Sequence, residues 1–74
     1  DPASISALRE TLQHSKPQIR AYSAWALGKM NDEKATKTLE EALVKEKKAK
    51  VVSEIRLALG LGKRINSMEV QNDR

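Results

Sequence analysis

An internal repeat of about 31 residues constrains this chain more than any other feature of the sequence. A shift of 31 residues places Leu8 on Leu39, and a shift of 32 residues places Leu27 on Leu59. The extra residue fits in the turn between two paired helices. A helical hairpin leaves an apolar face open, and a second hairpin stacked beside it covers that face. The repeat therefore predicts a solenoid fragment, unless two Leu-rich amphipathic hairpins resemble each other by chance.

The composition indicates that the repeated unit is helical. The good helix formers Ala, Leu, Lys and Glu supply 33 of the 74 residues, and no sustained alternation of apolar and polar residues indicates a strand. We therefore predict an all-α fold of four helices, an α-α superhelix of two hairpins. The predicted repeats cover residues 3–30 and 33–65 within a folded region of residues 1–65, and residues 66–74 are predicted to be a flexible polar tail.

Missing residue types exclude several functions for this chain. It contains no Cys, so it can hold no disulfide, thiolate zinc site or Cys-ligated iron–sulfur cluster. Its one histidine, His14, has no acidic residue at a spacing that would form a catalytic triad. We expect no catalytic, cofactor or metal site here, and no enzyme activity from this chain. With no long apolar run and no signal-peptide pattern, we expect a cytoplasmic location and no membrane partner.

The first repeat carries a recognisable motif. Residues 19–30 read IRAYSAWALGKM and are followed by an Asp-containing turn and a helix with Glu-Ala-Leu near its end. This pattern resembles the HEAT-like repeat of the phycobilisome-lyase type over roughly residues 3–62. The resemblance is weaker in the second repeat, where Val52 stands at the position of Arg20. Such departures are typical of a terminal, capping repeat.

A narrower resemblance concerns residues 14–20 and 24–29, together with the degenerate last hairpin and the polar tail. These features resemble the C-terminus of bacterial epoxyqueuosine reductases, which complete queuosine in tRNA. The resemblance implies that this chain is an accessory region that helps to hold tRNA. It also implies that cobalamin and iron–sulfur clusters belong to other domains of the parent enzyme, because none of their binding motifs is present here.

Basic residues gather where the repeat alignment places two inter-helix turns at one edge. Such a rim attracts phosphate by charge and counterion release, without reading bases. The alternative is a solvated charged turn that maintains solubility. The candidate phosphate or partner contacts are Lys16, Arg20, Lys45, Lys47, Lys48 and Lys50, with His14 beside them.

Three side chains of the second helix have two interpretations each. Arg20 either pairs with an acidic residue in the turn of a stacked neighbour, such as Asp32, Glu33 or a group upstream of this fragment, or contacts a ligand. Trp25 and Tyr22 are candidates either for stacking on a ligand or for packing between helix layers.

The partner expected from the basic rim is tRNA. The competing function is a protein–protein scaffold whose apolar open end docks a partner, an adjacent repeat or another copy of the chain.

Overall fold

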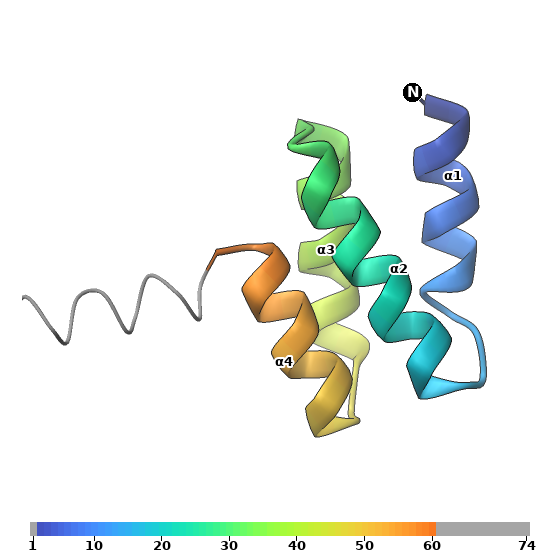
Figure 1. Cartoon of the computed structure of the whole chain (residues 1–74), viewed down its shortest axis with the longest axis vertical. Coiled ribbons are helices and arrows are strands. Elements are labelled where there is room, and N and C mark those ends of the chain that lie inside the picture. The colour runs from blue at the N-terminus through green and yellow to red at the C-terminus, as the bar shows by residue number, and fades with distance from the viewer. Residues whose placement is uncertain (1, 61–74) are drawn as a thin grey trace, which may run out of the picture.

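Four α-helices form the part of the chain that the computed structural model describes, residues 2–60 (Figure 1). Helices α1 (Pro2–Thr11) and α3 (Glu33–Lys45) make one layer, and helices α2 (Pro17–Met30) and α4 (Ala49–Ala58) make the other. Within each hairpin the two helices run in opposite directions, whereas α2 and α4 run in the same direction. The predicted all-α fold of two stacked helical hairpins is confirmed.

Three residues set the start of α2 and the boundary between the two hairpins. Pro17 occupies the first position of α2, where its missing N–H costs no helical hydrogen bond. Asn31 ends α2 with a left-handed φ of 50°, a conformation that Asn tolerates better than most residues. The Asp32 carboxylate then caps α3 by accepting a 2.7 Å hydrogen bond from the Lys34 backbone N–H.

Helices α1 and α4 are the two shorter helices, with ten residues each. Helix α1 ends at Thr11, because the N–H groups of Gln13 and His14 bond to carbonyls only three residues earlier and tighten the chain into a turn. Helix α4 ends at Ala58, and Gly60 follows with a φ of 81°. The predicted end of the second repeat at residue 65 and the predicted tail of residues 66–74 lie outside the described residues.

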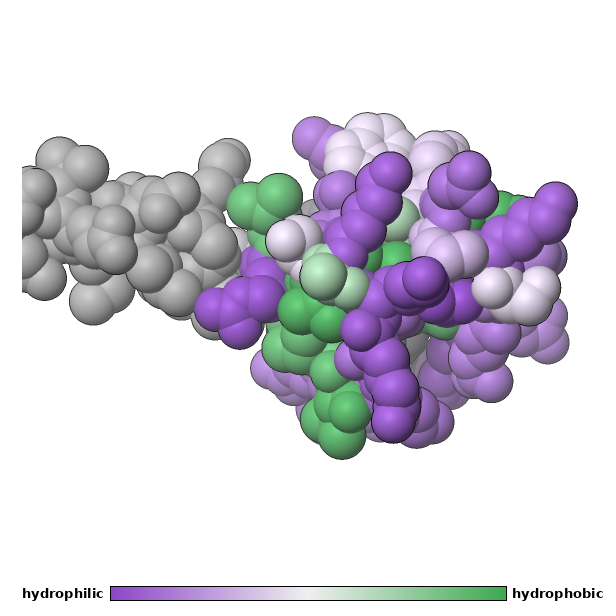
Figure 2. Space-filling view, turned by 90° about the horizontal axis from the view of Figure 1, so that it is seen from below, coloured by the Kyte–Doolittle hydropathy of each residue, from purple (hydrophilic) through white to green (hydrophobic). Residues whose placement is uncertain are grey.

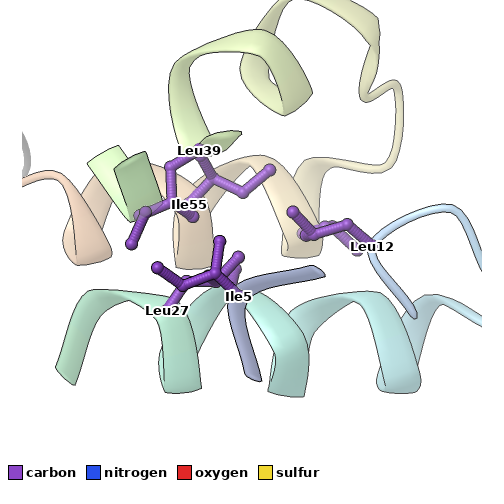
Figure 3. Close-up of a cluster of buried hydrophobic side chains, with 8 residues drawn as sticks. Ile5, Leu12, Leu27, Leu39 and Ile55 are labelled. Carbon is purple, nitrogen blue, oxygen red and sulfur yellow. The ribbon is translucent and has the colours of Figure 1, made fainter. Parts of the chain in front are cut away.

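The core lies between the layers and receives side chains from all four helices (Figure 3). Ser23 is the main polar group inside it, and its hydroxyl is hydrogen-bonded to the Thr11 hydroxyl and to the Ile19 carbonyl. No buried side-chain N or O atom of the described residues lacks a hydrogen-bond partner. The buried apolar residues are Ile5, Leu12, Ala24, Leu27, Ala35, Leu39, Val51 and Ile55.

Positions related by the shift of 32 residues have similar surroundings in α2 and α4. Ser23 and Ile55 are both buried, and Trp25 and Leu57 are exposed to nearly the same extent, 46% and 49%. Leu27 is buried while its counterpart Leu59 is half-buried. The second hairpin thus repeats the orientation of the first, but Leu59 of the second hairpin is less buried than Leu27 of the first.

Helices α2 and α4 touch through small residues. A Cβ atom built on Gly28 would lie 2.8 Å from the Ala58 Cβ and 3.0 Å from the Ala58 Cα. Ala24 lies one turn before Gly28 on the same side of α2 and is fully buried. On α4, the position that corresponds to Ala24 carries Arg56. The side of α4 that matches the packing side of α2 is therefore much bulkier.

Candidate functional site

Both hairpin turns lie at one end of the molecule, as the repeat alignment predicts. The chain between α1 and α2 and the chain between α3 and α4 both lie at the lower end of Figure 1. Figure 2 views the molecule from this end and shows hydrophilic side chains over most of it. We call this surface the turn end.

An ion pair joins the two turns. The Arg20 guanidinium donates from Nε to Oε1 of Glu46 at 2.9 Å and from one terminal nitrogen to Oε2 at 3.0 Å. The two side chains are only 16% and 7% exposed. A bidentate contact of this kind fixes both the distance between the guanidinium and the carboxylate and the relative orientation of their planes.

The same two side chains also organise the backbone of each turn. The second terminal nitrogen of Arg20 donates to the carbonyl oxygens of His14 at 2.7 Å and Ser15 at 3.1 Å. Oε2 of Glu46 accepts hydrogen bonds from the backbone N–H groups of Lys47 and Lys48. The pair therefore holds the first turn, the second turn and the start of α2 as one unit.

Arg20 pairs with Glu46, so the expected partners Asp32 and Glu33 were wrong. Asp32 and Glu33 lie beyond the opposite end of α2, and Asp32 instead caps α3. The general interpretation, that Arg20 reaches an acid in the turn of the stacked neighbour, agrees with the structure. A signal for Glu46 was present, because it is the one acidic residue among the lysines of residues 45–50.

The pKa of Glu46 is lowered from its ordinary value, chiefly by the hydrogen bond from Arg20, against an opposing effect of burial. Because the pKa is lower in the folded chain than in the unfolded chain, the stabilisation is complete above the unfolded pKa. It is lost as the pH falls toward the lowered value.

This shift predicts a specific dependence of stability on pH. We expect Glu46→Gln to lower the free energy of unfolding by about 1–2 kcal/mol at pH 6, and by much less at pH 3. Urea titrations of both proteins at the two pH values measure the difference. A gap between wild type and variant that stays constant with pH would contradict the assignment.

A groove of about 530 Å³ lies beside this ion pair, between the C-terminal parts of α1 and α3 and the second turn. Its floor includes the apolar side chains of Leu12 and Ala42. Five basic and two acidic side chains line it, which gives a net charge of +3. They are Arg9, Arg20, Lys45, Lys47 and Lys48, with Glu41 and Glu46.

The structure gathers some of the predicted basic contacts and separates others. Lys45, Lys47 and Lys48 line the groove, whereas Lys16 and Lys50 are exposed and do not line it. Arg20 is occupied by Glu46 and the first turn, so it is less available to a ligand than the lysines. His14 uses its ring Nδ1 to accept a hydrogen bond from the Lys16 backbone N–H. Sequence reasoning missed Arg9, which lines the groove and pairs at 3.5 Å with Glu41.

The two aromatic residues lie on the surface of α2 rather than between helix layers. Tyr22 is 64% exposed and Trp25 46%, and their ring centroids are 5.6 Å apart. Lys29 places its Nζ 5.5 Å from the centre of the Trp25 ring, within the range of a cation–π contact. Gly28 is the residue of α2 that lies against Ala58 of α4, and both rings lie on the exposed surface instead.

Residues 2–60 contain no group of three or more His, Cys, Asp or Glu side chains that could hold a metal ion. No helix among them is long and apolar enough to cross a membrane.

Comparison with known protein families agrees with this geometry. Residues 1–60 match the family of HEAT repeats, which is most of the chain. The chain belongs to the HEAT-repeat family. No curated protein and no solved structure gives a match.

Membership in the HEAT family supports a coarse functional class. HEAT repeats are generally non-catalytic scaffold elements that mediate interactions. In this HEAT chain, the basic groove lies at the turn end and the exposed aromatic pair lies on α2.

Proposed function

We propose that this HEAT-repeat chain is a non-catalytic recognition module that holds RNA by its phosphates in the basic groove. The observation that carries the proposal is the net charge of +3 among the residues lining the groove. Lys45, Lys47 and Lys48 form no ion pair with any residue of the described chain, so their ammonium groups are available to phosphate oxygens.

Recognition of this kind depends on where the lysines are held. The Glu46 carboxylate bonds to the N–H groups of Lys47 and Lys48, and Arg20 ties Glu46 to α2. The backbone that carries the lysines is therefore fixed before a ligand arrives. In a preformed site, the ordering of the loop reduces the free energy of binding by less than in a flexible one.

The resemblance described above suggests the ligand and the parent protein. We propose tRNA as the RNA, and an epoxyqueuosine reductase as the enzyme to which this module belongs. In that arrangement, cobalamin and iron–sulfur chemistry takes place in other domains, and this chain contributes only positioning.

Binding of an unmodified tRNA transcript, followed by fluorescence anisotropy, tests the proposal. With about three phosphates neutralised, the log–log salt slope is expected to be about −2 to −3. The affinity should therefore fall about 20- to 60-fold between 50 and 200 mM salt. Lys47→Gln combined with Lys48→Gln should make the slope shallower by roughly 1.4–1.8.

A matched control removes the same charge elsewhere. Lys34 and Lys37 are exposed in α3 and do not line the groove, so Lys34→Gln with Lys37→Gln should change the slope by less than half as much. An equal change of the salt slope in both double variants would show that the RNA is attracted by the net charge of the chain alone. That result, or binding that ignores salt, would reject the groove as an RNA site.

A protein–protein scaffold without a role in RNA binding is the second candidate. Exposed Tyr22 and Trp25 favour it, because aromatic side chains are enriched at the centres of protein interfaces. Normal tRNA affinity in Trp25→Ala would separate this surface from the groove.

A further inference from the structure

A shallow depression lies on the exposed surface of the α2–α4 layer. Tyr22 and Trp25 of α2 and Glu54 of α4 line it, together with the half-buried Ala21. None of these four residues lines the basic groove, so the two sites are separate. We call this site, defined by the four residues, the aromatic depression.

The two rings present aromatic surface to a ligand. Tyr22 and Trp25 are 64% and 46% exposed, and their ring planes are tilted by 33° to each other. The faces of an aromatic ring carry partial negative charge and attract cations. Lys29 shows this attraction within the chain, since its Nζ lies 5.5 Å from the centre of the Trp25 ring. Lys29 does not line the depression, so the aromatic surface inside it is not taken up by this lysine.

Glu54 adds a negative charge that no cation of the described chain neutralises. The ion pairs within residues 2–60 join Arg9 to Glu41 and Arg20 to Glu46, so Glu54 has no ion-pair partner among them. The side chain is half-buried, and a charge in such a position is screened less by water than a fully exposed one. Two aromatic rings beside such a carboxylate form a site for a cationic group.

The chemistry of the aromatic depression favours a guanidinium over an ammonium group. A guanidinium is planar, so it can stack on an aromatic ring while its N–H groups donate two parallel hydrogen bonds to a carboxylate. An ammonium group is compact and strongly hydrated, so it loses more solvation when it leaves water for an apolar surface. An arginine side chain is therefore the cation that uses the rings and the carboxylate together.

The contact between the two helices shows that Glu54 and Trp25 lie at nearly the same height. Gly28 of α2 lies against Ala58 of α4, and the two helices run in the same direction (Figure 1). The positions four residues before this contact, Ala24 and Glu54, are therefore level as well. Trp25 follows Ala24 directly, so the ring and the carboxylate act on one ligand group rather than on two.

A lysine lies about one helical turn beyond each end of the depression. Lys29 follows Trp25 by four residues and Lys50 precedes Glu54 by four residues, so each lies about 6 Å away, in opposite directions along the helices. Two residues of an extended chain span about 6.6 Å, and their side chains point to the same side. Acidic residues two positions before and after a bound arginine would therefore reach these two lysines.

We propose that the aromatic depression binds an arginine side chain of a partner protein, presented by an extended segment with an acidic residue two positions before it and another two positions after it. The guanidinium stacks on Tyr22 and Trp25 and donates to the Glu54 carboxylate, and the two acids pair with Lys29 and Lys50. The interaction takes place outside the basic groove and does not depend on the proposed RNA function.

Titration of the full chain with the end-blocked peptide Gly-Glu-Ser-Arg-Ser-Glu-Gly tests the proposal. Trp25 is the one tryptophan of the chain, so its fluorescence and its indole N–H signal report directly on the depression. We expect a dissociation constant of about 0.1–2 mM at low salt, since the contact is far smaller than the roughly 800 Å² per partner of a standard interface. Lysine in place of the peptide's arginine should raise it by about fivefold or more. Glutamine in place of both glutamates should raise it by about threefold or more.

Variants of the protein locate the binding site. Glu54→Gln should raise the dissociation constant about five- to tenfold, because the guanidinium loses its charged acceptor. Glu33→Gln is the matched control: it makes the same change in net charge at an exposed position in the first turn of α3, and should have less than about a twofold effect. Tyr22→Leu, which keeps an apolar side chain but removes the ring, should raise the constant about threefold. Circular dichroism checks that each variant is folded.

Trp25 signals that do not change with up to about 10 mM of the arginine peptide would overturn the proposal. Equal affinity for the arginine and lysine peptides would overturn it too, and this comparison leaves the fold of the protein untouched. Equal effects of Glu54→Gln and Glu33→Gln would show attraction by net charge and reject the depression as the site. These titrations contain no RNA and leave the lysines of the groove in place, so failure here is distinguishable from failure of the proposed RNA function.

Discussion

Replacing Arg20 with alanine is expected to lower the free energy of unfolding by about 2–4 kcal/mol. The variant loses two hydrogen bonds to Glu46 and those to the carbonyls of His14 and Ser15. It also leaves the Glu46 carboxylate, 7% exposed, without its counter-ion. A domain of this size has a total stability of only about 4–11 kcal/mol, so the loss is readily measured by urea denaturation.

The exposed ion pair between Arg9 and Glu41 provides the control for this variant. Its side chains are 58% and 63% exposed and 3.5 Å apart, so Arg9→Ala should change stability by less than about 0.5 kcal/mol. Combining Arg20→Ala with Glu46→Ala should cost less than the sum of the two single variants, because the double variant leaves no buried charge unpaired. A cost equal to the sum would show that the pair is not coupled.

Gly28→Ala is the second variant with a large expected effect, a loss of about 1–3 kcal/mol. Alanine ordinarily stabilises a helix interior by about 1 kcal/mol relative to glycine, so an opposite result is diagnostic of packing. The new methyl group would meet the Cβ of Ala58 at 2.8 Å and its carbonyl oxygen at 3.3 Å. Because part of this obstacle is backbone, α4 must move away from α2. Thermal unfolding followed by circular dichroism measures the change.

A double-mutant cycle with Ala58→Gly tests the cause. That change removes the closest atom and should recover part of the loss in Gly28→Ala, giving a favourable coupling of about 0.5–1.5 kcal/mol. The Ala58 Cα remains 3.0 Å away, so recovery is incomplete. A Gly28→Ala chain more stable than wild type would mean that the two helices are not in close contact.

The repeat and the helix-forming composition together were sufficient to predict the architecture. Sequence shifts of 31 and 32 residues placed both turns at one end, and the similar exposure of Trp25 and Leu57 agrees with them. Helix boundaries at Pro17 and Asp32 were also predictable, because each depends on a local rule for proline or for capping.

The partner of Arg20 was harder to predict, since Glu46 is 26 residues away in the sequence. Several acids satisfied the general pattern, and only the packing of the hairpins decides which of them is within reach. The position of Trp25 was ambiguous for a similar reason. Small residues precede and follow it along α2, so the sequence did not reveal which side of the helix faces α4.

The contrast between Ala24 on α2 and Arg56 at the matching place on α4 gives the stack a polarity. A further hairpin laid against α4 as α4 lies against α2 would confine the long cationic side chain between two helix backbones, far from water. Copies of the first hairpin engineered into this protein should therefore be accommodated on the α1–α2 side, whereas extension past α4 would first require a smaller, uncharged residue at position 56.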